Sequence, residues 1–140
     1  MIKLGCLVTL LAAVGLAASP PARAAGALVV GSTPDLKDGI AVGSAINHGT
    51  AEEAQAAALK VCREYKPAPK AAAMCRLVET FTGACFAFSF DPKPGTPGVG
   101  WAIAETKAEA EQRAVDNCKA VAGASRRDFC KIEQSNCDTK

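Results

Sequence analysis

The sequence predicts a single small α+β domain, in which two helices pack on a mixed or antiparallel sheet. The main observation is an internal repeat: each copy has a Thr, a Glu three residues later and a Cys twelve residues after the Thr. These residues are Thr50, Glu53 and Cys62, then Thr106, Glu109 and Cys118. A strand-like segment precedes each helix, Gly43-Ser44-Ala45-Ile46 and Gly100-Trp101-Ala102-Ile103. We therefore expect a pseudo-twofold strand-helix-strand repeat, with halves at about residues 39–90 and 99–137.

Residues 1–24 have the pattern of a signal peptide. Lys3 gives a positive start, residues 4–18 are apolar, and Ala22-Arg23-Ala24 has the small residues of a cleavage site. We expect cleavage near Ala24 and a mature domain of residues 25–140. The apolar segment is shorter than the ~20 residues that span a bilayer, so we expect no membrane span. The sequence thus predicts a secreted or periplasmic bacterial protein.

Six segments are expected to be strands, because they are short, apolar or alternating, and bounded by turn residues. They cover residues 26–31, 39–47, 75–81, 85–90, 100–103 and 129–136. Phe86, Phe88 and Phe90 alternate with period two, so their rings share one face of the sheet. We expect the helices to cover that face.

Both helices are expected to begin at a capping box. The Thr side chain accepts from the backbone N–H of the Glu, and the Glu side chain accepts from the backbone N–H of the Thr. Small side chains then form the stripe that each helix lays on the sheet. The two stripes consist of Ala54, Ala58, Val61 and Cys62, and of Ala110, Ala114 and Cys118.

The six cysteines that follow the leader are expected to form three disulfides, as in many small exported domains. Six cysteines allow fifteen connectivities, and spacing alone does not choose among them. The repeat favours Cys62–Cys75 and Cys118–Cys130, so that Cys85–Cys137 would join the two copies. Structural zinc is disfavoured, because neither a C-x2-4-C nor an H-x3-5-H pair is present. We expect no metal and no cofactor.

The charge balance disfavours nucleic-acid binding. The sixteen Lys and Arg residues include Lys3 and Arg23, so the chain from Ala25 has fourteen basic and fourteen acidic residues. A neutral domain has no surplus field to hold polyphosphates.

The chain resembles the bacterial exported family called domain of unknown function 4189. The resemblance lies in residues 39–43, the Ala-rich helix that ends at Cys62, residues 75–81, Gly100-Trp101-Ala102 and the second helix that ends at Cys118. It implies a compact secreted or periplasmic α+β module. It carries over no catalytic residue.

His48, the single histidine, is the candidate for catalysis, because it lies between a strand and a helix where catalytic loops often act. A small secreted hydrolase would pair it with a carboxylate such as Asp38 or Glu52. The sequence shows no nucleophile elbow around Ser44 or Ser89 and no phosphate-binding loop.

Trp101 is the candidate for partner binding. It follows the Pro- and Gly-rich loop Asp91–Gly98, which includes Lys93, Pro94 and Thr96, and its repeat counterpart is the small Ser44. Trp is enriched at binding hot spots, although the ring could also lie in the core. The first hypothesis is a non-enzymatic module that binds a protein of the envelope or medium through Trp101 and this loop. A purely structural envelope role is the third alternative.

Overall fold

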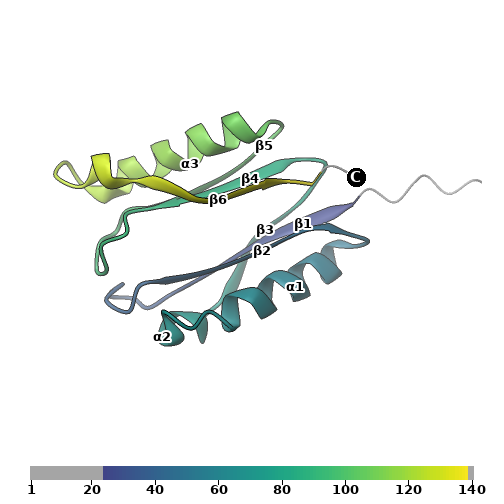
Figure 1. Ribbon diagram of the computed structural model, residues 1–140, viewed down its shortest axis with the longest axis horizontal. Coiled ribbons are helices and arrows are strands. Elements are labelled where there is room, and N and C mark those ends of the chain that lie inside the picture. Colours follow the sequence, from purple (N-terminus) through teal and green to yellow (C-terminus); the bar gives the residue numbers. More distant parts are fainter. Residues whose placement is uncertain (1–23, 139–140) are drawn as a thin grey trace, which may run out of the picture.

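The computed structural model describes residues 24–138, which form two stacked sheets with helices on their outer faces (Figure 1). The layers therefore follow the order helix, sheet, sheet, helix. The expected α+β class is confirmed, but the six strands are divided between two antiparallel sheets instead of being joined in one. Apart from Ala24, the expected signal peptide lies outside the described residues.

Each sheet has three strands, and the strand that comes first in the chain lies in the middle. The first sheet has the order β2 (Ile40–His48), β1 (Ala25–Ser32), β3 (Arg76–Thr82). The second sheet has the order β5 (Val99–Ala104), β4 (Cys85–Phe90), β6 (Lys131–Cys137). All neighbouring strands are antiparallel. The sheets divide the chain at Gly83 and Ala84, whereas the sequence repeat placed the division at residues 91–98.

One long helix covers the outer face of each sheet. These helices are α1 (Ala51–Arg63) on the first sheet and α3 (Lys107–Ala122) on the second. A short helix, α2 (Pro69–Ala72), follows α1, and a 3-10 turn, η1 (Arg127–Phe129), follows α3. Within residues 24–138, no helix is both long and apolar enough to cross a membrane.

The two helix starts differ in their caps. At α1 the box is complete: the Thr50 hydroxyl accepts from the Glu53 N–H at 3.1 Å, and the Glu53 carboxylate accepts from the Thr50 N–H at 3.2 Å. At α3 the Thr106 hydroxyl accepts from the Glu109 N–H at 3.2 Å. The expected return bond of Glu109 is wrong, because its carboxylate pairs with Arg113 one turn further along the helix.

Each long helix packs closely against a glycine of the neighbouring strand. A Cβ atom on Gly43 would lie 2.0 Å from the Ala58 carbonyl oxygen of α1. A Cβ atom on Gly100 would lie 2.3 Å from both the Ala114 carbonyl oxygen and the Cys118 nitrogen of α3. The alanines and cysteines of the two predicted stripes are buried, as expected. The inclusion of Val61 was wrong, because Val61 is 49% exposed on α1. Only a residue without a side chain allows so close a packing of helix on strand.

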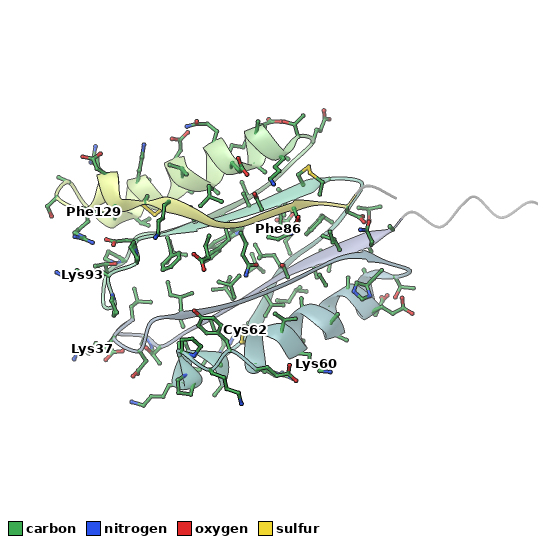
Figure 2. All side chains as sticks on the ribbon, in the orientation of Figure 1. Lys37, Lys60, Cys62, Phe86, Lys93 and Phe129 are labelled. Atoms are coloured by element: carbon green, nitrogen blue, oxygen red, sulfur yellow. A yellow bond between two sulfur atoms is a disulfide. The ribbon has the colours of Figure 1, made fainter. Side chains whose placement is uncertain are left out.

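The large apolar side chains lie between the two sheets. The buried members of this core are Leu28, Val42, Phe81, Phe86 and Phe88. Figure 2 shows Phe86 in this layer. The expectation that the Phe face is covered by helices is therefore wrong: β4 turns the smaller Cys85 and Ala87 toward α3, because a close helix leaves no room for rings.

The six cysteines form three disulfides, which are the pairs that the repeat favours. They are Cys62–Cys75, Cys85–Cys137 and Cys118–Cys130. Cys85–Cys137 joins the neighbouring strands β4 and β6 of the second sheet. The repeat had suggested that this disulfide would join the two copies. In the structure it lies within the second sheet and does not connect the two sheets. The sheets are held together by the core between them and by polar contacts such as Ser44 to Gln134, 3.1 Å.

Candidate functional site

Trp101 lies on β5, an edge strand of the second sheet. The strand is held on one side only, by β4, where Trp101 is the register partner of Phe88. Its neighbours Gly100 and Ala102 are buried, whereas the Trp101 residue keeps 40% of its surface exposed. A large ring is thus presented at the rim of the sheet instead of being enclosed in the core.

An open groove runs between β5 and α3 beside this ring. Its volume is about 410 Å³, and we call it the Trp101 groove; the lining residues are Val99, Gly100, Trp101, Asn117, Ala120 and Val121. Val121 is 51% exposed, so the lining includes two large apolar residues that are both accessible to solvent. The Asn117 side-chain amide donates to the Trp101 carbonyl oxygen at 2.9 Å, which fixes the strand edge to the helix. The groove is therefore lined by apolar residues and by a strand edge that is hydrogen-bonded to the helix.

The counterpart position in the first sheet has no such groove-forming ring. Ser44 occupies it, and its hydroxyl donates to the Gln134 side-chain oxygen of β6 at 3.1 Å. The position equivalent to Trp101 is therefore used for a contact between the sheets. The asymmetry noted in the sequence corresponds to a difference in exposure and partners.

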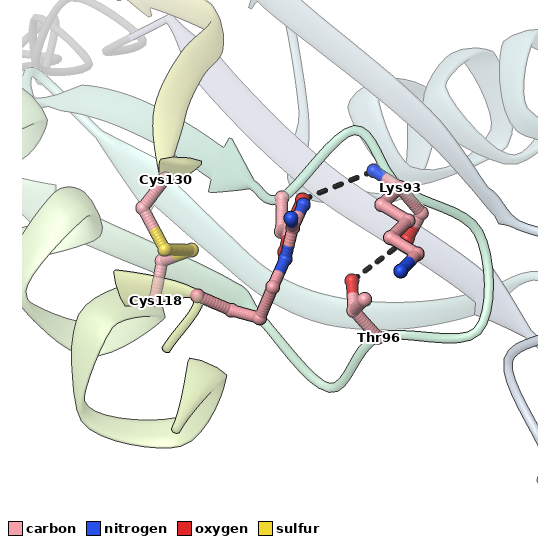
Figure 3. A network of polar contacts seen from close by, with 6 residues as sticks. Lys93, Thr96, Cys118 and Cys130 are labelled. Atoms are coloured by element: carbon pink, nitrogen blue, oxygen red, sulfur yellow. Dashed lines mark hydrogen bonds and ion pairs between the residues drawn. A yellow bond between two sulfur atoms is a disulfide. The ribbon is translucent and has the colours of Figure 1, made fainter. Parts of the chain in front are cut away.

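The loop Asp91–Gly98 is closely braced, although its sequence predicts an irregular surface segment. The Asp91 N–H donates to the Gly98 carbonyl at 2.8 Å and closes the loop. The Lys93 N–H donates to the Asp91 carboxylate at 3.0 Å, and the Thr96 hydroxyl donates to the Lys93 carbonyl at 2.8 Å (Figure 3). Thr96 therefore serves the loop itself, whereas Lys93 and Pro94 are exposed at its tip.

An ion pair between the buried Asp91 and the partly buried Arg126 holds the base of this loop. The Arg126 guanidinium donates two hydrogen bonds to the Asp91 carboxylate, at 2.7 Å and 2.6 Å. These bonds from Arg126 lower the pKa of Asp91 to about 2, against the opposing effect of burial. The same guanidinium lies 3.9 Å from the centre of the Phe129 ring. This cluster connects the loop to the chain that follows α3.

Sequence reasoning missed this cluster. The sequence places Asp91 only as the first residue of the Pro- and Gly-rich loop. The one available signal was a charged residue directly after an apolar strand, where a carboxylate at the sheet end often needs a partner. Nothing in the sequence identifies Arg126 as that partner, because residues 91 and 126 meet only through the packing of α3 on β4.

The loop and the Trp101 groove are separate features. The loop tip contacts the turn between β1 and β2, where the Gly95 N–H donates to the Leu36 carbonyl at 2.9 Å. The hollow at this contact and the Trp101 groove have no lining residue in common. The expected site is thus divided into an apolar groove and a polar loop tip.

Comparison with known proteins assigns the chain to a family. Residues 25–137 match the sequence model of the family described as "domain of unknown function (DUF4189)", from the first strand to the last. The chain belongs to this family. Comparisons with curated proteins and with solved structures give no match.

In this DUF4189 domain, His48 is not brought to Asp38. His48 ends β2 and Asp38 precedes it, so the strand separates them by about 30 Å at ~3.3 Å per residue. Asp38 pairs with Lys70 instead, at 3.4 Å. Glu52 is exposed on α1, and the His48 imidazole makes no hydrogen bond or ion pair with a carboxylate within residues 24–138.

No metal-binding cluster is present in the described part of this DUF4189 domain. Between residues 24 and 138, no three His, Cys, Asp or Glu side chains are grouped so as to hold a metal ion. All six described cysteines are used in disulfides.

Proposed function

We propose that this DUF4189 protein is an exported, non-enzymatic interaction module that binds another protein of the envelope or medium through the Trp101 groove. The observation that carries the proposal is the exposure of Trp101 on an edge strand, in a groove that the exposed Val121 also lines. A Trp that a partner desolvates is among the strongest contributors to interface affinity. The uncharged strand β5 supports this assignment, since free edges are usually protected by charged side chains.

Export is part of the proposal. The leader pattern of residues 1–24 supports it, and so do the three disulfides, because such bonds persist in oxidising compartments. The loop Asp91–Gly98 has a supporting role. Its ion pair to Arg126 fixes the point where β5 begins, and its exposed Lys93 and Pro94 offer a second, smaller contact.

The test is a capture experiment with matched baits. Processed, oxidised protein is immobilised and exposed to envelope and culture-fluid extracts of its source cell, beside Trp101→Ala, Val121→Ala and Val61→Ala variants. Val61 is 49% exposed on α1, so it matches Val121 in residue type and exposure but lies outside the groove. We expect saturable capture of a protein by the wild type and by Val61→Ala, and at least a tenfold loss of affinity with the two groove variants.

The single Trp provides a direct readout of the same contact. Binding should remove water from the indole ring and shift its fluorescence to shorter wavelength. A captured partner that binds Trp101→Ala and Val121→Ala as tightly as the wild type would contradict the groove as the binding surface. Recovery of no saturable partner would contradict the module itself and favour the structural envelope role.

A further inference from the structure

The start of β1 is built around a buried carboxylate at the other end of the chain. Asp138 is only 3% exposed, and its two carboxylate oxygens accept from the Asn47 N–H and the Gly83 N–H, each at 3.1 Å. Its own N–H donates to the Ala84 carbonyl at 2.8 Å. No Lys, Arg or His side chain forms an ion pair with it within residues 24–138. A buried carboxylate without a cation is unusual, because burial makes an uncompensated charge costly.

The two donors place this carboxylate at the N-terminal end of β1. Asn47 is near the end of β2, and Gly83 follows the end of β3. β1 runs between these strands, with about 4.8 Å to each neighbour, so a single carboxylate that bonds both must lie across the end of the central strand. That end is Ala25, whose register partners are His48 and Thr82, the residues adjacent to the two donors.

The expected cleavage site falls at the same point. Hydrolysis of the Ala24–Ala25 peptide bond consumes one water and gives a carboxylate on Ala24 and an ammonium group on Ala25. Ala24 and Ala25 are 8% and 4% exposed. A peptidase needs an accessible extended segment, so cleavage must precede the closure of β1 between its neighbours. The new ammonium group then enters the fold with the strand.

We propose that the α-ammonium group of Ala25, created by cleavage after Ala24, forms an ion pair with Asp138. This inference rests on the export part of the proposed function. The pair supplies the cation that the buried carboxylate lacks, and it ties the two ends of the mature domain together. Removal of the leader then also affects the folded domain, because the precursor has no free amine on Ala25 and cannot form this ion pair.

The pairing has a defined pH signature. Asp138 favours the charged amine, so the pKa of the amine in the folded domain rises above its ordinary range of about 7.7–8.0. The stabilisation is fully present below that range and is lost as the pH rises through the raised pKa. Other titratable groups near this end, on the elements around β1 and beside Asp138, are His48, Glu52, Glu53, Glu105 and Lys107.

The test uses the full chain, exported and processed by its producing cell. N-terminal sequencing should give Ala25, and any other N-terminus overturns the inference. The amine pKa is then measured from the pH dependence of its reaction with an acylating reagent. We expect it to be raised by about one unit, equivalent to a tenfold shift of the protonation equilibrium. The free energy of unfolding in urea should fall as the pH passes that value.

Two variants, processed in the same way, provide the controls. Asp138→Asn removes the charge of the carboxylate. In this variant we expect the amine to have an ordinary pKa, and the free energy of unfolding not to fall as the pH rises through this range. Glu105→Gln removes a carboxylate that lines the same hollow without bonding Asn47 or Gly83, and we expect it to behave as the wild type. If Asp138→Asn does not fold, the wild-type value still decides: an unraised amine pKa overturns the ion pair.

The outcomes separate this inference from the proposed function. An unraised pKa on a protein that begins at Ala25 and captures its partner overturns the ion pair alone. Loss of capture with a raised pKa overturns the binding module alone.

Discussion

Ser89 is an unusual residue of the core, because its hydroxyl is buried without a hydrogen-bond partner among the described residues. A buried hydroxyl that lacks a partner has lost its hydrogen bonds to water without replacement. Ser89→Ala should therefore raise the free energy of unfolding by about 1 kcal/mol. Urea denaturation checks this value. Ser135→Ala is the control and should lower stability, since the Ser135 hydroxyl is bonded to Glu111; a loss of stability in Ser89→Ala would show that its hydroxyl has a partner.

Protonation of Asp91 should cause a fall in the free energy of unfolding of the domain at acidic pH. Its pKa is lowered from 3.8 to about 2 by the bonds from Arg126, so its contribution to stability is complete above about pH 4. That contribution is lost as the pH falls through about 2, because the unfolded state binds the proton first. Acid titration of the free energy of unfolding should show this step in the wild type. Asp91→Asn should be less stable at pH 7 and lack the step; its persistence in the variant would assign it to another carboxylate.

At the scale of elements, the two helices depend on the glycines beneath them. Gly43→Ala and Gly100→Ala should each lower the free energy of unfolding by about 2–3 kcal/mol or more, since the added methyl meets rigid backbone and not a flexible side chain. Thermal or urea denaturation measures the effect. Gly95→Ala is the control: nothing lies within 4 Å of its Cβ position, so only its positive φ opposes the change. Equal losses at all three positions would indicate a general effect of backbone restriction instead of helix contact.

The elements were the part of the structure that the sequence predicted best. Thr50 and Thr106 mark both long helices, because a capping residue acts within one turn of its own position. The strand with Phe86, Phe88 and Phe90 was also predicted, but the layer that its rings face was not. Period two shows that the rings share a face, whereas the identity of the covering layer depends on how the whole chain packs. The predicted bond from the Thr106 N–H to the Glu109 carboxylate was wrong for a similar reason, because Arg113 pairs with that carboxylate on the helix surface.

At the scale of the whole molecule, the longest disulfide loop should contribute most to stability. Cys85–Cys137 encloses a separation of 52 residues, compared with 13 and 12 for the other pairs. In the chain-entropy treatment this corresponds to about 4 kcal/mol, against about 3 kcal/mol for each short loop. The double variant Cys85→Ser/Cys137→Ser should therefore lose more stability in urea than Cys118→Ser/Cys130→Ser. Mass mapping of an unreduced digest checks the pairing, and a peptide that joins Cys85 to any other cysteine would contradict it.

The pairing could be predicted because symmetry relates residues that are near in sequence. The site could not be predicted to the same extent. Trp101 was identified from its contrast with Ser44, but the groove requires Val121, which lies on α3 and has no distinguishing neighbour in the sequence. Asp138 was not singled out at all, because its donors Asn47 and Gly83 are distant along the chain. Contacts between residues so far apart in the sequence form only when the two sheets stack.

No disulfide crosses between the halves: Cys62–Cys75 lies in the half of the first sheet, and Cys85–Cys137 and Cys118–Cys130 lie in the half of the second. The covalent connection between the two sheets is the exposed turn at Gly83. Cleavage of the backbone at that turn would leave two fragments, each closed by its own disulfides. Their reunion would be a bimolecular association, driven by the apolar faces that carry Leu28, Phe86 and Phe88. The midpoint of that association would depend on fragment concentration, so the cohesion between the sheets could be measured as a dissociation constant.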